Sequence, residues 1–286
     1  MSETNDFILT ITCPDVIGIV STVSTFLTEN GAFVTEAAQY GDPFSQRFFM
    51  RIKFIPGEQL NDIDALRERF LPLAQRFQMV WSLRDASVKS RAVIMVSKFG
   101  HCLNDLLHRY RTGTLPIEIC AVISNHEDMR DYVEWHNIPY FCYPVSRETK
   151  SRQESQIMAQ LDSISPDLVV LARYMQILSP ELCFRLAGRA INIHHSFLPS
   201  FKGAKPYHQA HARGVKIIGA TAHYVTTDLD EGPIIDQSVE TVDHTQTPDD
   251  LAAIGRDIES LVLARAVRYH IEHRVLLNGN RTVVFK

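Results

Sequence analysis

The segment from Ala190 to Gly203 carries the side chains best suited to catalysis in this chain. It begins as a short apolar strand pattern, Ala190 to Ile193, and polar residues appear where the pattern ends. Asn192 and His194 are two residues apart, so in an extended strand their side chains point to the same side. Open α/β sheets bind their ligands in the crevice beyond the carboxyl ends of the strands. We therefore expect the amide and the imidazole to face one cleft.

A second segment, Ala222 to Ile235, supplies carboxylates. It runs from a strand pattern through an acidic turn and back into a strand pattern, and the turn contains Asp228 and Asp230. Either aspartate can complete a set of amide, imidazole and carboxylate. Taken singly, such residues are common in turns and as hydrogen-bonded core groups. The prediction of a catalytic site therefore depends on their combination.

Both segments resemble the formyltransferase family, whose members carry one-carbon units on tetrahydrofolate. The resemblance is carried by Ile191-Asn-Ile-His194, Ser196-Phe-Leu-Pro-Ser-Phe-Lys-Gly203, Thr221-Ala-His223 and Leu229-Asp230-Glu-Gly-Pro-Ile-Ile235. With a small domain in front, it extends over the chain from Phe7 to the C-terminus. It implies hydrolysis of 10-formyltetrahydrofolate to tetrahydrofolate and formate for one-carbon and purine metabolism, with the folate as substrate and no separate cofactor.

The resemblance assigns catalytic roles to Asn192, His194 and Asp230. Asn192 would donate an N–H to the oxyanion of the tetrahedral intermediate, and His194 would donate to the same oxygen and then protonate the departing nitrogen. Asp230 would orient the imidazole and hold or deprotonate the attacking water. His195 and His223 are expected to support these groups.

The segment Leu171 to Pro180 follows another strand end and resembles the folate-binding segment of the family. Its backbone groups and apolar surfaces would hold the pterin, a flat ring with polar edges that suits a mostly apolar cleft. By residue type alone, the apolar members fit a protein core better, but their place after a strand favours binding. The residues assigned to folate binding are Arg173, Tyr174, Met175, Ile177, Leu178 and Asp228, and Asp228 also competes with Asp230 for the carboxylate role.

The loop from Ser97 to Asn104 bears on the choice between two reactions. In the family's glycinamide ribonucleotide formyltransferase, the equivalent loop is glycine-rich, and its backbone N–H groups cradle the phosphate of the acceptor. Bulky residues are expected to fill that pocket here, so that water is the acceptor: Lys98, Phe99, His101 and Cys102. The stretch Gly203 to His208 also departs from that transferase. The alternatives are a formyltransferase with an amine acceptor and a non-catalytic sensor of amino acids or folate.

Between Ala92 and Leu171, short apolar strand patterns alternate with amphipathic helix patterns. Such alternation predicts a parallel sheet wound by right-handed crossovers. A long helix begins near Thr247, which serves as its cap, and runs to about His273. The fold class expected for residues 92–286, the catalytic domain, is therefore α/β: a Rossmann-like, mostly parallel sheet with helices on both faces.

Residues 1–85 predict a separate domain with the order β-α-β-β-α-β, the ferredoxin-like arrangement. The polar stretch 86–91 is the expected linker. Cys13 to Val20 resembles the opening of an ACT domain, a class that commonly binds amino acids and pairs through its sheets. We therefore expect a homo-oligomer, a dimer or a tetramer, and an amino-acid effector near Asp15 and Gly18. The simpler alternative is that Asp15 caps the helix and Gly18 relieves crowding.

Composition argues against several classes of partner. A net charge of −4 provides no basic field for nucleic acid. No apolar run approaches the roughly 20 residues of a membrane span, and the polar start has no signal-peptide pattern, so we expect a cytoplasmic protein. Five scattered cysteines without a C-x-x-C pair predict reduced thiols. The histidines near the site lack the H-E-x-x-H spacing, so no metal is expected: His194, His195, His208, His211 and His223.

Overall fold

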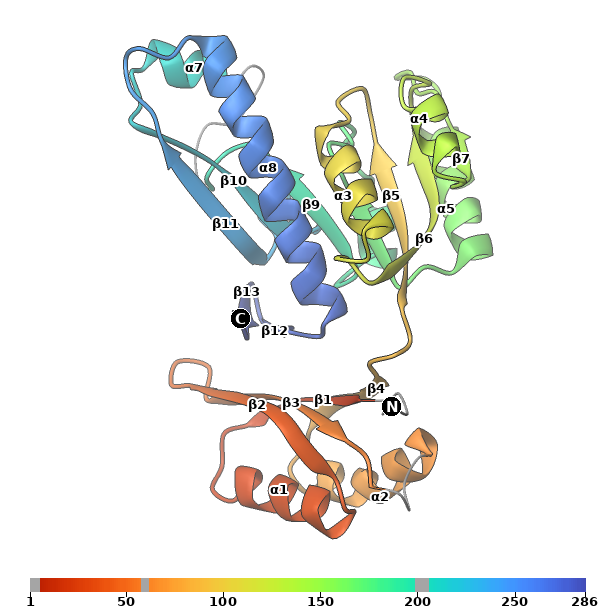
Figure 1. Cartoon of the computed structure of the whole chain (residues 1–286), viewed down its shortest axis with the longest axis vertical. Coiled ribbons are helices and arrows are strands. Elements are labelled where there is room, and N and C mark those ends of the chain that lie inside the picture. The colour runs from red at the N-terminus through yellow and green to blue at the C-terminus, as the bar shows by residue number, and fades with distance from the viewer. Residues whose placement is uncertain (1–5, 58–61, 199–205) are drawn as a thin grey trace. The chain divides into compact units, whose positions relative to one another are not determined.

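Residues 6–57, 62–198 and 206–286 are described by the computed structural model, and the chain divides into two units (Figure 1). The first unit consists of residues 1–89 together with 272–286, and the second of residues 90–271. The motif residues Pro199 to Lys205, which carried part of the family resemblance and of the acceptor argument, lie outside the described residues.

The first unit contains the predicted β-α-β-β-α-β order. Its sheet is antiparallel with the strand order β2-β3-β1-β4, and both helices cover one face (Figure 1). Alternate residues of the first strand, from Phe7 to Cys13, point into a core shared with the helices. The ferredoxin-like fold is therefore confirmed. The elements of the unit are β1 (Phe7–Pro14), α1 (Ile19–Glu29), β2 (Phe33–Asp42), β3 (Arg47–Ile55), α2 (Ile63–Arg76), β4 (Val80–Asp85), β12 (Val275–Asn278) and β13 (Arg281–Val284).

The C-terminal hairpin, β12 and β13, belongs to the first unit. The buried Arg51 donates from Nε to the backbone oxygen of Glu272 at 3.0 Å. Asn278 donates from Nδ2 to the buried carboxylate of Asp42 at 2.7 Å. The sequence analysis had placed residues 272–286 in the catalytic domain. The structure differs because these contacts join residues 221 and 236 positions apart, which no local pattern records.

We expect deletion of residues 272–286 to destabilise the first unit. Arg51 is 1% exposed, and its buried Nε would lose its acceptor, which costs about 1–3 kcal/mol. Urea unfolding followed by the fluorescence of Trp81 measures this unit, once Trp135 of the second unit is replaced by phenylalanine. Lys286→Ala, which removes an exposed side chain at the end of the same segment, should leave the transition nearly unchanged. An unaltered Trp81 transition after the deletion would contradict the assignment of the hairpin to this unit.

The second unit is a seven-stranded sheet with the order β11-β10-β9-β8-β5-β6-β7. The strands from β7 to β9 run parallel, whereas β10 is antiparallel to both β9 and β11. The predicted α/β class with a mostly parallel sheet is confirmed. In chain order the elements are β5 (Ser90–Val96), α3 (His101–Arg111), β6 (Ile117–Ser124), α4 (Arg130–Trp135), β7 (Tyr140–Cys142), α5 (Lys150–Ile164), β8 (Leu168–Leu171), α6 (Pro180–Arg185), β9 (Ala190–His194), α7 (Pro206–Ala212), β10 (Ile217–Tyr224), β11 (Ile234–Thr241) and α8 (Pro248–Ile271).

Helices cover both faces of this sheet. On one face, Val93 and Met95 of β5 share a core with Ile157 of α5 and Leu182 of α6. On the opposite face lie α3 and α8 (Figure 1), and α8 packs against α3, β9, β10 and β11. Among the residues that the structure describes, no helix combines the length and the apolar character needed to cross a membrane.

Candidate active site

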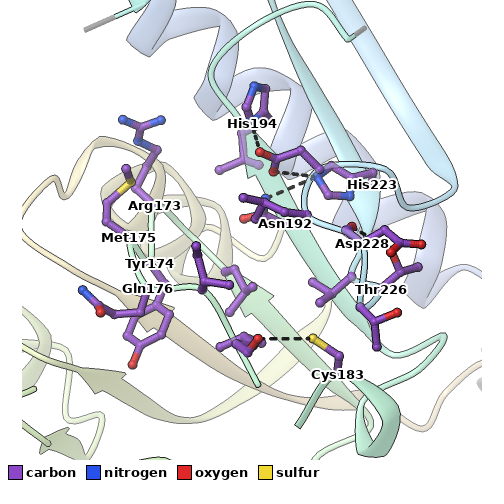
Figure 2. A pocket seen from close by; sticks show the side chains of 18 of the residues that line it. Arg173, Tyr174, Met175, Gln176, Cys183, Asn192, His194, His223, Thr226 and Asp228 are labelled. Carbon is purple, nitrogen blue, oxygen red and sulfur yellow. Dashed lines mark hydrogen bonds and ion pairs between the residues drawn. The ribbon is translucent and has the colours of Figure 1, made fainter. Parts of the chain in front are cut away.

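One cavity of about 220 Å³ is lined by all nine residues that the sequence predicted for catalysis or folate binding. Its walls come from β8, from β9 and from the loops that follow β8 and β10. Figure 2 shows Arg173 and Met175 on one side of the pocket, with Asn192 and His223 across from them. The nine predicted residues are Asn192, His194, Asp230, Arg173, Tyr174, Met175, Ile177, Leu178 and Asp228. The lining also contains residues that the sequence analysis did not single out, among them Gln176, Thr226 and Thr227.

Antiparallel pairing of β9 with β10 places Asn192 directly opposite His223. Residues opposite each other in a ladder point to the same face of a sheet, and Nδ2 of Asn192 lies 3.3 Å from Nε2 of His223 (Figure 2). The other ring nitrogen of His223, Nδ1, donates to the carbonyl oxygen of Tyr224 at 2.9 Å. An amide nitrogen carries two hydrogens. Asn192 therefore keeps one N–H for a ligand in the pocket.

The carboxylate of Asp230 lies between two imidazoles. Its Oδ2 is 3.1 Å from Nδ1 of His194, and its Oδ1 is 3.7 Å from Nε2 of His223. Asp230 has φ = 58°, a left-handed conformation that aspartate adopts more readily than most residues. Gly232 passes so close to the backbone of Tyr224 that any Cβ atom there would collide with the carbonyl oxygen. The turn from Asp230 to Gly232 therefore directs the Asp230 carboxylate toward His194.

The alternative carboxylate, Asp228, lines the same pocket but is exposed. Its backbone oxygen accepts a hydrogen bond from Oγ1 of Thr226 at 3.0 Å, which shapes the turn. The carboxylate that contacts His194 belongs to Asp230. The geometry thus favours Asp230 over Asp228, as the position in the motif does.

Electrostatics keep Asp230 charged. Burial acts to raise its pKa, but the hydrogen bonds and charges of His194 and His223 outweigh burial and hold the pKa far below the usual range of a carboxyl. His195 stacks on His194, with ring centroids 4.8 Å apart. Burial, together with the nearby charges of Arg173 and His194, lowers the pKa of His195 to about 4. Near neutral pH the cluster therefore combines a carboxylate with an uncharged His195.

His194 has one ring nitrogen engaged and one directed elsewhere. Nδ1 faces Asp230, whereas Nε2 is buried and has no hydrogen-bond partner within residues 6–57, 62–198 and 206–286. A buried ring nitrogen without a partner costs free energy. Nε2 is accordingly the ring nitrogen of His194 that the described residues leave without a hydrogen bond.

The wall assigned to folate has an exposed and a buried part. Met175 and Ile177 are 52% and 60% exposed although they are apolar, which is typical of a binding surface. Tyr174 is buried in the core beneath, and Leu178 packs against that core. The phenol of Tyr174 accepts a hydrogen bond from Nε2 of Gln153 at 3.0 Å. Met175 and Ile177 are therefore the members of the predicted set that offer free apolar surface.

Ser97 already occupies two of the backbone groups that were expected to bind the pterin. Its Oγ accepts from the N–H of Met175 at 3.0 Å, and its own N–H donates to the carbonyl oxygen of Arg173 at 3.3 Å. The hydroxyl of Ser97 in turn donates to Oδ1 of Asn125 at 2.7 Å. These bonds hold the loop after β8 in place, and they leave its side chains and remaining backbone groups for a ligand.

The loop that was expected to fill an acceptor pocket is only partly turned inward. His101 and Cys102 point into the protein, whereas Lys98 and Phe99 are exposed. Nε2 of His101 lies 2.7 Å from Oε2 of Glu259 on α8. Of the four bulky side chains that were expected to fill the acceptor pocket, only His101 and Cys102 point inward.

Two residues beside the site, Glu259 and Tyr207, were missed by the sequence analysis. The carboxylate of Glu259 is buried, and its Oε1 accepts a hydrogen bond from the hydroxyl of Tyr207 at 2.7 Å. The available signal was Gly255, because glycine is unfavourable inside a helix unless it makes room for a neighbour.

His101, Cys102 and Glu259 bring potential metal-ligand atoms within 4.8 Å of one another. Burial, followed by the charge of Glu259, raises the pKa of the Cys102 thiol far above its usual range. The thiolate, not the thiol, is the metal ligand, and the imidazole is already hydrogen-bonded to the carboxylate. The arrangement therefore suits a hydrogen-bond network better than a metal site.

Comparison with known proteins gives the family. A model described as Formyl transferase matches residues 90–267. A formyltetrahydrofolate deformylase of Corynebacterium sp. (strain P-1) is 52% identical over 286 residues, which cover all of this chain and all of that protein. This chain belongs to the formyltetrahydrofolate deformylase family. The family resemblance predicted from the sequence is thereby confirmed.

Solved structures separate the deformylase family from its relatives. The crystal structure of formyltetrahydrofolate deformylase from Burkholderia mallei matches with a TM-score of 0.94 and 52% identity, over 99% of this chain and 100% of that chain. Glycinamide ribonucleotide transformylase 1 from Symbiobacterium toebii matches with a TM-score of 0.65 and 28% identity, over 69% of this chain and 95% of that chain. The deformylases thus match the whole chain, and the transformylase matches about two thirds of it.

The low pKa of His195 predicts a loss of stability in acid. Unfolding exposes the imidazole, so that its pKa returns from about 4 toward 6.5. The unfolded chain then binds more protons than the folded chain between these pH values, and the free energy of unfolding falls as the pH is lowered through this window. Urea unfolding followed by Trp135 fluorescence in a Trp81→Phe background measures this dependence. His195→Gln should flatten it and the exposed His211→Gln should not; an equally steep dependence in His195→Gln would contradict the prediction.

Proposed function

We propose that this chain hydrolyses 10-formyltetrahydrofolate to tetrahydrofolate and formate. The observation that carries the proposal is the contact between Asp230 and His194, with Asn192 two residues away in the same pocket. Deformylase relatives that match the full length of the chain support it. In the proposed complex the pterin covers the exposed apolar surfaces of Met175 and Ile177, and the formyl group reaches the catalytic cluster.

In the proposed mechanism, water attacks the formyl carbon while negative charge develops on the formyl oxygen. The free N–H of Asn192 donates to that oxygen, and one such donor is worth on the order of 3 kcal/mol in comparable sites. A carboxylate with a very low pKa is a weak base. We therefore assign proton transfer to Nε2 of His194, which takes the proton of water and delivers it to the departing nitrogen. Asp230 holds Nδ1 and stabilises the imidazolium that forms.

Two alternatives differ in what happens to the formyl group. A formyltransferase would pass it to an amine. The match to a transformylase over about two thirds of the chain is the observation that favours this alternative. A non-catalytic sensor of folate would not release it at all. The contact between Asp230 and His194 opposes the sensor, because binding a folate does not require a charged pair at the formyl position.

We expect purified protein to release formate from 10-formyltetrahydrofolate in buffer without any acceptor. Asp230→Asn and His194→Ala should lower the rate by about 10² to 10⁴-fold, the usual contribution of acid-base catalysis. Glu231→Gln, which alters an exposed carboxylate in the same turn, is the matched control and should retain the rate. Release that starts only after glycinamide ribonucleotide is added would establish the transferase, and inertness in both conditions would support the sensor.

We also propose that the first unit is an ACT-like domain that binds an amino acid near Asp15 and Gly18 and takes part in a cytoplasmic homo-oligomer. Gly18 precedes α1 with φ = 98°, and no side chain caps the helix there. A Cβ atom at Gly18 would meet nothing within 4 Å, so its backbone conformation, rather than crowding, requires glycine. The N–H groups in the first turn of α1 remain suited to a carboxylate.

Thermal unfolding in the presence of each common amino acid tests this effector proposal. At least one amino acid should raise the unfolding temperature, because a ligand that binds only the folded state stabilises it. Gly18→Val should abolish the shift, since valine does not tolerate a positive φ. Gly113→Val places the same substitution at a glycine with φ = 73° in the second unit and serves as the control. If no amino acid shifts the transition, the first unit has no effector of this class.

A further inference from the structure

Arg173 occupies a conformation and an environment that do not favour an arginine. Its φ is 65°, a region in which a residue with a Cβ atom is strained. Its side chain is 11% exposed, and Nε and Nη1 have no hydrogen-bond partner in the described part of the chain. Both features cost free energy. Backbone preference and hydrogen bonding therefore do not by themselves favour an arginine at this position.

A second buried group, Glu259, holds this guanidinium. Its Oε2 lies 3.4 Å from Nε of Arg173 and 2.7 Å from Nε2 of His101, and its Oε1 accepts a hydrogen bond from Tyr207 at 2.7 Å. Burial acts to raise the pKa of Glu259, but these partners outweigh burial and lower the pKa. Glu259 is therefore ionised and is the counter-charge of Arg173.

The network around Glu259 joins four separate elements. His101 begins α3, Tyr207 lies in α7, Glu259 lies in α8, and Arg173 follows β8. Gly255 lies one turn before Glu259, and any Cβ atom there would collide with the phenol of Tyr207. Glycine inside a helix costs about 1 kcal/mol relative to alanine. Gly255 thus lowers the stability of α8 but leaves room for Tyr207, which keeps the network around Glu259 and Arg173 in place.

Arg173 lies at the edge of the proposed reaction site. It lines the same pocket as His194 and His195, and its charge contributes to the low pKa of His195. Figure 2 shows Arg173 across the pocket from Asn192. The apolar part of the pocket is assigned to the pterin, and the turn that carries Asp230 closes another side. The Arg173 side chain therefore occupies part of the pocket on the side across from Asn192.

We propose that the side chain of Arg173, fixed by Glu259, excludes any acceptor larger than water and thereby makes the reaction a hydrolysis. This inference rests on the proposed function and names the residue that sets its acceptor. Without that side chain, an amine can attack the formyl carbon. The bond from this carbon to the folate nitrogen then breaks, a new C–N bond to the amine forms, and a proton of the amine passes to the folate nitrogen. No oxidation or reduction is involved.

The test compares two substitutions at Arg173 with glycinamide as the amine. Glycine adopts φ = 65° without strain, so Arg173→Gly removes the side chain and leaves the backbone in place. Arg173→Met keeps a long unbranched side chain and removes the charge. With a ¹³C-labelled formyl group on the folate, NMR measures both products, formate and N-formylglycinamide, in one sample. Arg173→Asn, which introduces a short side chain that adopts φ = 65° more readily than most residues, replaces the glycine variant if the latter does not fold.

The ratio of N-formylglycinamide to formate is expected to be low both in the wild type and in Arg173→Met, whatever the rate of formate release in that variant. Arg173→Gly should raise the ratio of N-formylglycinamide to formate by about tenfold or more, the order of discrimination that packing in a pocket provides. An unchanged ratio in Arg173→Gly would overturn the proposal. Equal transfer by the glycine and methionine variants would overturn it too, because charge rather than bulk would then exclude the amine. Absence of formate from the wild type without amine would instead contradict the proposed hydrolase function.

Discussion

A partly buried negative charge at Asp230 is the constraint on which the candidate site depends. A carboxylate is removed from water at high cost unless donors surround it. Nδ1 of His194 contacts the Asp230 carboxylate at 3.1 Å, and His223 borders it at 3.7 Å because β9 and β10 pair in the register that brings Asn192 opposite His223. The loop after β10 can return the carboxylate to this cluster because Gly232 has no side chain. The antiparallel strand beside an otherwise parallel sheet is thus what completes the site.

The partly buried Asp230 and the buried Glu259 are both carboxylates with lowered pKa values whose charges act on His195, and their surroundings differ. Asp230 is bordered by imidazoles and opens to the pocket, so its charge acts on groups that can exchange protons. Glu259 is bordered by an arginine, a histidine and a tyrosine and is 1% exposed, so its charge acts on the shape of the wall. In both places donors stabilise a carboxylate; in the proposed mechanism Asp230 serves the chemistry, and in the proposed exclusion of amines Glu259 serves selectivity.

The chain passes between the two units twice, at residues 89–90 and at residues 271–272. The second passage links α8, which carries Glu259, to the hairpin that the first unit holds through Arg51 and Asp42. Arg51 is a buried charge that needs the backbone of the returning segment as an acceptor. The C-terminal segment is therefore a structural part of the first unit, although it follows the last helix of the second.

The sequence by itself determined the fold class of both units, because strand alternation and helix periodicity are local properties of the chain. Its motifs also selected Asp230 over Asp228, and the geometry agrees. Only the tertiary structure decided that Glu259 is buried and that residues 272–286 return to the first unit. A helix pattern shows which face is apolar, but the partner of a buried charge is a residue distant in sequence, and only folding brings the two together.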